Sequence, residues 1–187
     1  VTLSEAVTLA SGVLNVTLDT GDVISVTGTY PTDTLTGTYT IGAGDSSTDL
    51  DATAIVLASG TLRDAAGNDA TVSLPATTIA DGSAIIIDGN VPTVSSITSA
   101  KADGTYGIGE TINVTVTMSE PVTLTGTLNV TLDTGDVIAV AGTYPTDTLT
   151  GTYTVGTGDS STDLDATGIT LASGTLRDAA GNDATVS

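Results

Sequence analysis

The chain repeats itself at the length of a whole domain, and this feature constrains its fold more than any other. Residues 12–73 align with residues 126–187 at an offset of 114, with 55 identities in 62 positions. Further upstream, Ser4-Glu5 matches Ser119-Glu120 at an offset of 115, so the first copy has one extra residue between Leu9 and Leu14. Solenoid repeats are about 20–50 residues long. We therefore expect two copies of one domain, not a solenoid.

The two copies cover different parts of the repeat. Val1 aligns with Val116, so nothing in the first copy corresponds to residues 88–115. The second copy reaches only the equivalent of Ser73, and nothing in it corresponds to residues 74–87. We expect domains at 1–87, which lacks its first strand, and at 88–187, which lacks its last strand. The polypeptide is then expected to continue in both directions or to take strands from neighbours.

Apolar residues alternate with Thr, Asn or Ser in both copies, which is the period of a half-buried strand. The segment 111–118 shows this pattern, and so do 127–132 and 149–155. Turn signals separate such segments, and we expect Ser4-Glu5 and Ser119-Glu120 to end strands. About seven short strands in ~100 residues predict an all-β chain of tandem immunoglobulin-like antiparallel β-sandwiches. Tyr39 and Tyr153 are expected in the cores, each with its hydroxyl bonded at a strand corner.

Composition excludes several classes of function. The chain has no His and no Cys, so it cannot build a Ser-His-Asp triad, a disulfide or a typical zinc site. With 3 Lys+Arg against 22 Asp+Glu, its formal charge is −19. This balance argues against nucleic acid and anionic membrane surfaces as partners, and the apolar runs are far too short to span a membrane. We expect no enzyme, because the acids sit in scattered turns instead of the paired arrangement of a glycosidase.

The carboxylates are concentrated in loops, which suggests a hard cation. Calcium takes 6–8 oxygen ligands at about 2.3–2.6 Å, and uncompensated negative charge in a compact fold repels itself. If the strand order is immunoglobulin-like, one pole of the second domain would gather Asp88, Glu120 and Asp178. The equivalent pole of the first domain would hold Glu5 and Asp64, and residues from across the junction would add further oxygens. The predicted Ca²⁺ ligands are Glu5, Asp45, Asp49, Asp51, Asp64, Asp88, Glu120 and Asp178.

Simpler interpretations of the same residues stay open. Asp, Asn and Gly are common turn formers, and an acidic surface also suits a protein adapted to high salt. Asn15, Asn113 and Asn129 each begin a match to the glycosylation sequon, but such matches arise by chance in Thr-rich strands. Arg63 and Arg177 are expected to pair with a nearby Asp.

Four motifs occur in a fixed order in the second copy: Asp88-Gly89-Asn90-Val91-Pro92, Gly107-Ile108-Gly109-Glu110, Met118-Ser119-Glu120-Pro121-Val122 and Arg177-Asp178-Ala179-Ala180-Gly181-Asn182. With them the chain resembles the tandem bacterial immunoglobulin-like repeats of giant surface proteins and adhesins. The resemblance implies a β-sandwich, secretion, tandem arrays and calcium at domain junctions, and it implies no catalytic residues. Asn90 departs from the small residue that many relatives carry there.

The function expected first is therefore structural, a module of an extracellular bacterial stalk, adhesin or surface fibre that calcium stiffens. Its partners would be neighbouring identical repeats or subunits. The alternative is a subunit of a self-assembled extracellular filament, in which subunits complete each other's sandwiches by strand donation. A carbohydrate-binding module ranks third, because the chain has no Trp or Phe for a stacking platform.

Overall fold

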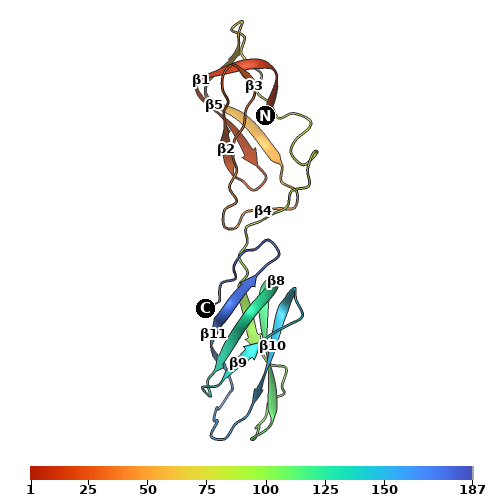
Figure 1. The fold of residues 1–187 in the computed structure, drawn as a ribbon, viewed down its shortest axis with the longest axis vertical. Helices are drawn as coiled ribbons and strands as arrows, with labels where there is room; N and C mark the ends of the chain where they lie inside the picture. Colours follow the sequence, from red (N-terminus) through yellow and green to blue (C-terminus); the bar gives the residue numbers. More distant parts are fainter. Residues whose placement is uncertain (187) are drawn as a thin grey trace. The chain divides into compact units, whose positions relative to one another are not determined.

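The computed structural model describes residues 1–186, which contain strands, turns and loops but no helix. No segment of these residues therefore forms a helix long and apolar enough to cross a membrane. The chain divides into two compact units, Val1–Gly89 and Asn90–Ser187 (Figure 1). Each unit has antiparallel sheets in a sandwich arrangement, which confirms the all-β prediction.

The second unit is built around one long strand. Its strands are β7 (Val94–Thr98), β8 (Thr111–Leu132), β9 (Val137–Val140), β10 (Thr146–Thr154) and β11 (Ala166–Arg177). The first half of β8 pairs with β7 and β10, so that Val116 lies between Ile97 and Leu149. The second half pairs with β9 and β11, so that Val130 lies between Ile138 and Ile169. The same strand therefore contributes to both sheets.

The first unit repeats the second half of this plan. Its strands are β1 (Thr2–Leu18), β2 (Val23–Val26), β3 (Thr32–Thr34), β4 (Ser46–Ser47), β5 (Ala52–Asp64) and β6 (Ile87–Asp88). β1 takes the place of β8, and Val16 lies between Ile24 and Ile55 in the register seen around Val130. β3 adds to β1, and the short β4 and β6 pair with each other.

The prediction that Ser4-Glu5 and Ser119-Glu120 end strands was wrong. β1 runs from Thr2 to Leu18 and β8 from Thr111 to Leu132, straight through these pairs. In β8 the pairing with β7 stops at Met118, and the pairing with β11 begins at Thr123. The backbone stays extended where the strand passes from one sheet to the other, so a change of partner looks like a strand end in the sequence.

The alternating pattern places aliphatic side chains inside both units and Thr outside. Along β8, Ile112, Val114, Val116 and Met118 are buried, whereas Thr111, Asn113, Thr115 and Thr117 are exposed or half-buried. Tyr153 is buried as predicted, and its hydroxyl donates to Asp159 Oδ2 at 2.6 Å. Tyr39 makes the same bond to Asp45 but is only half-buried. The predicted hydroxyl bond at a strand corner, called the tyrosine corner below, is therefore present in both units, whereas the predicted core position is confirmed for Tyr153 alone.

The extra residue of the first copy forms a β-bulge. In the second unit Gly126 faces Gly174 in the ladder between β8 and β11. In the first unit the ladder passes from Ala10 opposite Thr61 directly to Val13 opposite Ser59. Ser11 and Gly12 are accommodated there, and Ser11 has a φ of 51°, in the left-handed region that is uncommon for residues other than glycine.

Candidate metal centre

Three acids of separate strands and loops come together in the structure. Asp88 ends β6, Glu120 lies in the middle of β8, and Asp178 directly follows β11. One carboxylate oxygen from each lies within 4.8 Å of the other two. Asp178 is buried, whereas Asp88 and Glu120 are half-buried. Within residues 1–186, this is the single group of three or more acids close enough to hold one metal ion.

The turn that follows β11 fixes the Asp178 carboxylate. Its Oδ1 accepts hydrogen bonds from the amides of Gly181 at 2.7 Å and Asn182 at 2.9 Å, and its Oδ2 accepts one from Asn182 Nδ2 at 2.7 Å. Burial raises the pKa of Asp178, but these hydrogen bonds outweigh it and hold the pKa below the ordinary value. Asp178 is therefore a charged, preoriented carboxylate at neutral pH.

The spacing of the three oxygens suits a calcium ion. Two oxygens that each lie about 2.3–2.6 Å from one ion can be separated by at most about 5 Å, and the observed limit of 4.8 Å meets this condition. Three carboxylates supply part of the 6–8 oxygens that calcium takes, which leaves positions for water and carbonyl groups. Three like charges this close repel one another unless a cation or a proton compensates them.

The first unit contains two of these three positions. Asp64 corresponds to Asp178, and its carboxylate accepts hydrogen bonds from Asn68 Nδ2 at 2.7 Å and from the Asn68 amide at 2.8 Å. The Asn68 side chain and amide hold the pKa of Asp64 below its usual value. Glu5 corresponds to Glu120 and is exposed. Glu5 and Asp64 belong to no group of three close acids among the described residues.

The other predicted ligands accept hydrogen bonds from loop residues of the first unit. Asp45 Oδ2 accepts hydrogen bonds from the Tyr39 hydroxyl at 2.6 Å and the Gly42 amide at 2.7 Å. Asp49 Oδ1 accepts one from the Ile85 amide at 3.1 Å. Asp51 accepts hydrogen bonds from the Thr78 hydroxyl at 2.9 Å and from the amides of residues 79 and 80. These three carboxylates therefore hold loops, and none belongs to the group of Asp88, Glu120 and Asp178.

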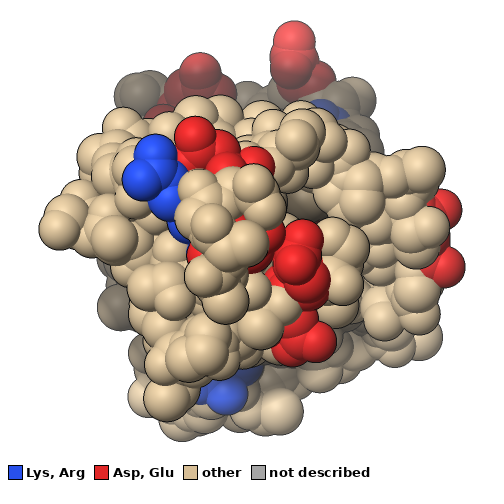
Figure 2. All heavy atoms as spheres, turned by 90° about the horizontal axis from the view of Figure 1, so that it is seen from above, with Lys and Arg blue, Asp and Glu red and all other residues tan. Residues whose placement is uncertain are grey.

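The remaining charges are dispersed over the surface. Figure 2 shows acidic side chains scattered over the visible face, with few basic ones among them. Arg63 pairs with Asp69 and Arg177 with Asp183, both at 2.6 Å, and all four side chains are largely exposed. Such exposed pairs contribute about 0–1 kcal/mol each, so they organise their turns more than they stabilise the fold.

Comparison with protein-family models, with curated proteins and with solved structures finds no match for this chain. Sequence reasoning grouped Asp88, Glu120 and Asp178 by assuming a strand order. It did not identify Asp45 as the hydrogen-bond partner of Tyr39, although Tyr and Asp recur six residues apart in both copies.

Proposed function

We propose that the chain is a structural module of an extracellular bacterial stalk, adhesin or surface fibre of immunoglobulin-like repeats. The observation that carries the proposal is the near-identity of two successive sandwich units, with 55 identities in 62 aligned positions. An array of like domains supports a role as a spacer, because each copy adds length without adding a new surface chemistry. Thr-covered strand faces and a charge of −19 suit a surface exposed to water.

Calcium at Asp88, Glu120 and Asp178 would stiffen such a module. Asp88 lies two residues before Asn90, where the second unit begins, and Glu120 and Asp178 belong to that unit. An ion bound to all three would hold the carboxylates of Asp88, Glu120 and Asp178 together. Without the ion, repulsion among these carboxylates would push them apart. Calcium sites of extracellular modules bind in the range of about 10⁻⁴–10⁻³ M.

A melting experiment tests the calcium proposal. Binding to the folded state alone stabilises by RT ln(1 + [L]/Kd), about 2.7 kcal/mol at 100 Kd. We expect millimolar calcium to raise the Tm of the second unit, and a chelator to reverse the shift. Glu120→Gln with Asp178→Asn should abolish the shift, since both amides keep the shape of the side chain but lose its charge.

The first unit provides the matched control for that experiment. Glu5→Gln with Asp64→Asn changes the equivalent positions, which belong to no group of three close acids within residues 1–186, and it should leave the calcium response intact. Small-angle scattering with and without calcium reports the flexibility of the whole chain. If calcium changes neither the Tm nor the scattering, the acids are turn formers and the calcium proposal is withdrawn.

The stalk proposal has a separate test. Antibodies raised against this chain should label intact cells of the source bacterium, and external protease should remove the signal. Labelling only after the cells are lysed would overturn the extracellular assignment. A filament assembled by strand donation is the second candidate, because an apolar cavity in the first unit would accept a strand of another chain as well as one of its own.

A further inference from the structure

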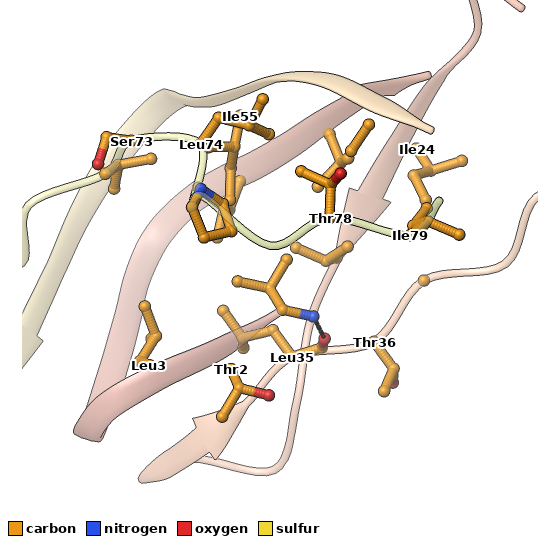
Figure 3. A pocket seen from close by; sticks show the side chains of 18 of the residues that line it. Thr2, Leu3, Ile24, Leu35, Thr36, Ile55, Ser73, Leu74, Thr78 and Ile79 are labelled. Atoms are coloured by element: carbon orange, nitrogen blue, oxygen red, sulfur yellow. Dashed lines mark hydrogen bonds between the residues drawn. The ribbon is translucent and has the colours of Figure 1, made fainter. Parts of the chain in front are cut away.

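The first unit contains an apolar cavity that reaches its core. The cavity has a volume of about 580 Å³. Its walls include core side chains of β1, β2, β5 and the β3 region, namely Leu14, Val16, Val26, Leu35, Ile55 and Leu62. Figure 3 shows Leu35 and Ile55 on opposite sides, with the segment that carries Leu74 and Ile79 passing between them. That segment covers the core without filling it.

The second unit contains residues 92–115, and its structure shows what fills the corresponding space. The six counterparts of those side chains are Leu128, Val130, Val140, Leu149, Ile169 and Leu176, and all of them belong to one packed cluster. Ile112 and Val114 of the first half of β8 are buried in the same cluster, and Ile97 of β7 packs against it. The cavity of the first unit therefore corresponds to the space that the strand pair of residues 92–115 fills in the second unit.

Backbone hydrogen bonds give the register in which such a pair would enter. The Val1 amino group donates to the Leu35 carbonyl at 2.8 Å, and the Leu35 amide donates to the Val1 carbonyl at 2.9 Å. This repeats the pairing of Val116 with Leu149. In the second unit the strand extends upstream from Val116 to Thr111 along β10. Polypeptide that enters the ladder through Val1 is thus directed along the wall of the cavity.

The opposite edge of the cavity lacks a strand partner that its counterpart has. In the second unit Thr185 forms a parallel bridge with Thr93, and its amide donates to the Pro92 carbonyl at 2.8 Å. Thr71, the counterpart of Thr185, lines the cavity and forms no bridge. The cavity has backbone groups on two edges and aliphatic side chains between them. A β-strand fits such a cavity, because it forms main-chain hydrogen bonds at its edges and places side chains in the middle.

We propose that this cavity is the seat of a strand pair with the sequence pattern of residues 92–115, joined directly to Val1. The inference deepens the proposed function and rests on it only in treating the units as repeats of one array. In another copy of the chain, residues 92–115 are already packed in its second unit, so donation in trans would require that unit to open. The covalent source needs no such opening.

The experiment compares the 187-residue chain with a fusion that carries a second copy of residues 88–115 ahead of Val1. We expect the fusion to raise the Tm of the first unit by about 10 °C or more, because several aliphatic side chains become buried. Amide exchange at Leu35 and Thr71 should slow by at least about 100-fold. The matched control carries Ile112→Asp and Val114→Asp in the added copy alone, and it should show neither effect.

Two further measurements distinguish a covalently joined strand pair from one donated by a separate chain. A free peptide of residues 88–115 is added to the 187-residue chain, and the oligomeric state of both chains is measured. If the peptide stabilises the first unit and the fusion does not, the donor is a separate chain and the covalent proposal is overturned. If the fusion and its Asp control melt alike, no strand pair occupies the cavity. Both results leave surface labelling and the calcium response unaffected, so they are distinguishable from failure of the proposed function.

Discussion

The two units share almost every residue of their aligned part, yet their cores are not equally packed. Among the described residues, the cluster of the second unit contains 14 buried side chains and that of the first unit contains nine. Ile138 and Tyr153 are buried at 8% and 3% exposure, whereas their counterparts Ile24 and Tyr39 are half-buried. Leu128 and Leu14 are both fully buried. The units therefore differ in the burial of some counterparts, and of these Ile24 lines the cavity of the first unit.

This difference shows that two nearly identical segments of sequence can be buried to different extents. The substitutions between the copies, such as Ser25 for Ala139, are small and lie mostly on exposed positions. What changes is the set of strands outside the aligned stretch. β7 and the first half of β8 complete the second unit, whereas residues 74–87 pass over the first unit in an irregular path. Burial of a residue is thus set by strands far away in the sequence.

The largest expected effect comes from removing the same leucine in both units. Leu149 and Leu35 are counterparts with 0% exposure. Leu149→Ala should destabilise the second unit by about 3–5 kcal/mol, because it leaves a new cavity in a closely packed core. Leu35→Ala should cost about 2–3 kcal/mol, because Leu35 already lines a cavity and has fewer neighbours to lose. Chemical denaturation of the full chain, followed by residue-specific amide exchange, measures both costs.

Equal costs would break the comparison, since they would mean that the first unit packs as tightly around Leu35 as the second does around Leu149. The conservative pair Leu149→Met and Leu35→Met serves as the control. Volume-conserving changes usually cost below about 1.5 kcal/mol, so neither variant should reproduce the difference between the units.

A smaller effect is expected from the tyrosine corner. Tyr153→Phe removes the hydrogen bond to Asp159 and should destabilise the second unit by about 1.5–3 kcal/mol, the range for hydrogen bonds to charged groups. Tyr39→Phe removes the equivalent bond to Asp45, and its cost should be lower because Tyr39 is half-buried. Urea denaturation of the two variants gives the comparison. A larger cost for Tyr39→Phe would contradict it.

The same corner predicts a pH dependence with a defined sign. The Tyr153 hydroxyl and the Gly156 amide hold the pKa of Asp159 below its ordinary value. A carboxylate with a depressed folded-state pKa contributes stability above its unfolded pKa of about 3.9, and this contribution is lost as the pH falls through the lower folded value. Burial, followed by the bond to Asp159, raises the pKa of Tyr153. Its contribution is complete below about pH 10 and is lost as the pH rises through the higher folded value.

Tyr153→Phe should therefore flatten both limbs of the stability curve of the second unit. The acid limb flattens because the pKa of Asp159 returns toward its ordinary value, and the alkaline limb flattens because no phenol remains to ionise. Thermal melting from pH 2 to pH 11 gives the curve. If the variant keeps both limbs of the parent curve, the corner does not couple these ionisations to folding.

The sequence predicted the features that depend on local pattern. Period-two alternation gave the strands and their inward faces, and the repeat gave two like units. The prediction of a strand end at Ser119-Glu120 was wrong, because a strand that passes from one sheet to another keeps an extended backbone while its partner strands change. The acids Asp88, Glu120 and Asp178 could be grouped only by assuming a strand order. The partners of Asp49 and Asp51 lie in residues 78–85, which have no counterpart in the second copy, so the repeat held no information on them.

The smallest expected effect concerns the one residue that the first copy has in addition. Ser11 adopts a φ of 51°, which costs about 1 kcal/mol or more for a residue with a Cβ. Ser11→Gly removes this cost, while the flexibility of glycine in the unfolded chain offsets part of the gain. We expect the first unit to gain about 0.5 kcal/mol, measured as a rise in its denaturation midpoint. The control is Thr125→Gly, at a position of β8 without a positive φ, which should lose about 1–2 kcal/mol, because glycine is more flexible in the unfolded chain and the Thr125 hydroxyl accepts a hydrogen bond from the Thr175 amide at 3.1 Å. If Ser11→Gly destabilises the first unit as much as Thr125→Gly destabilises the second, the bulge holds no strain and the extra residue is accommodated without cost.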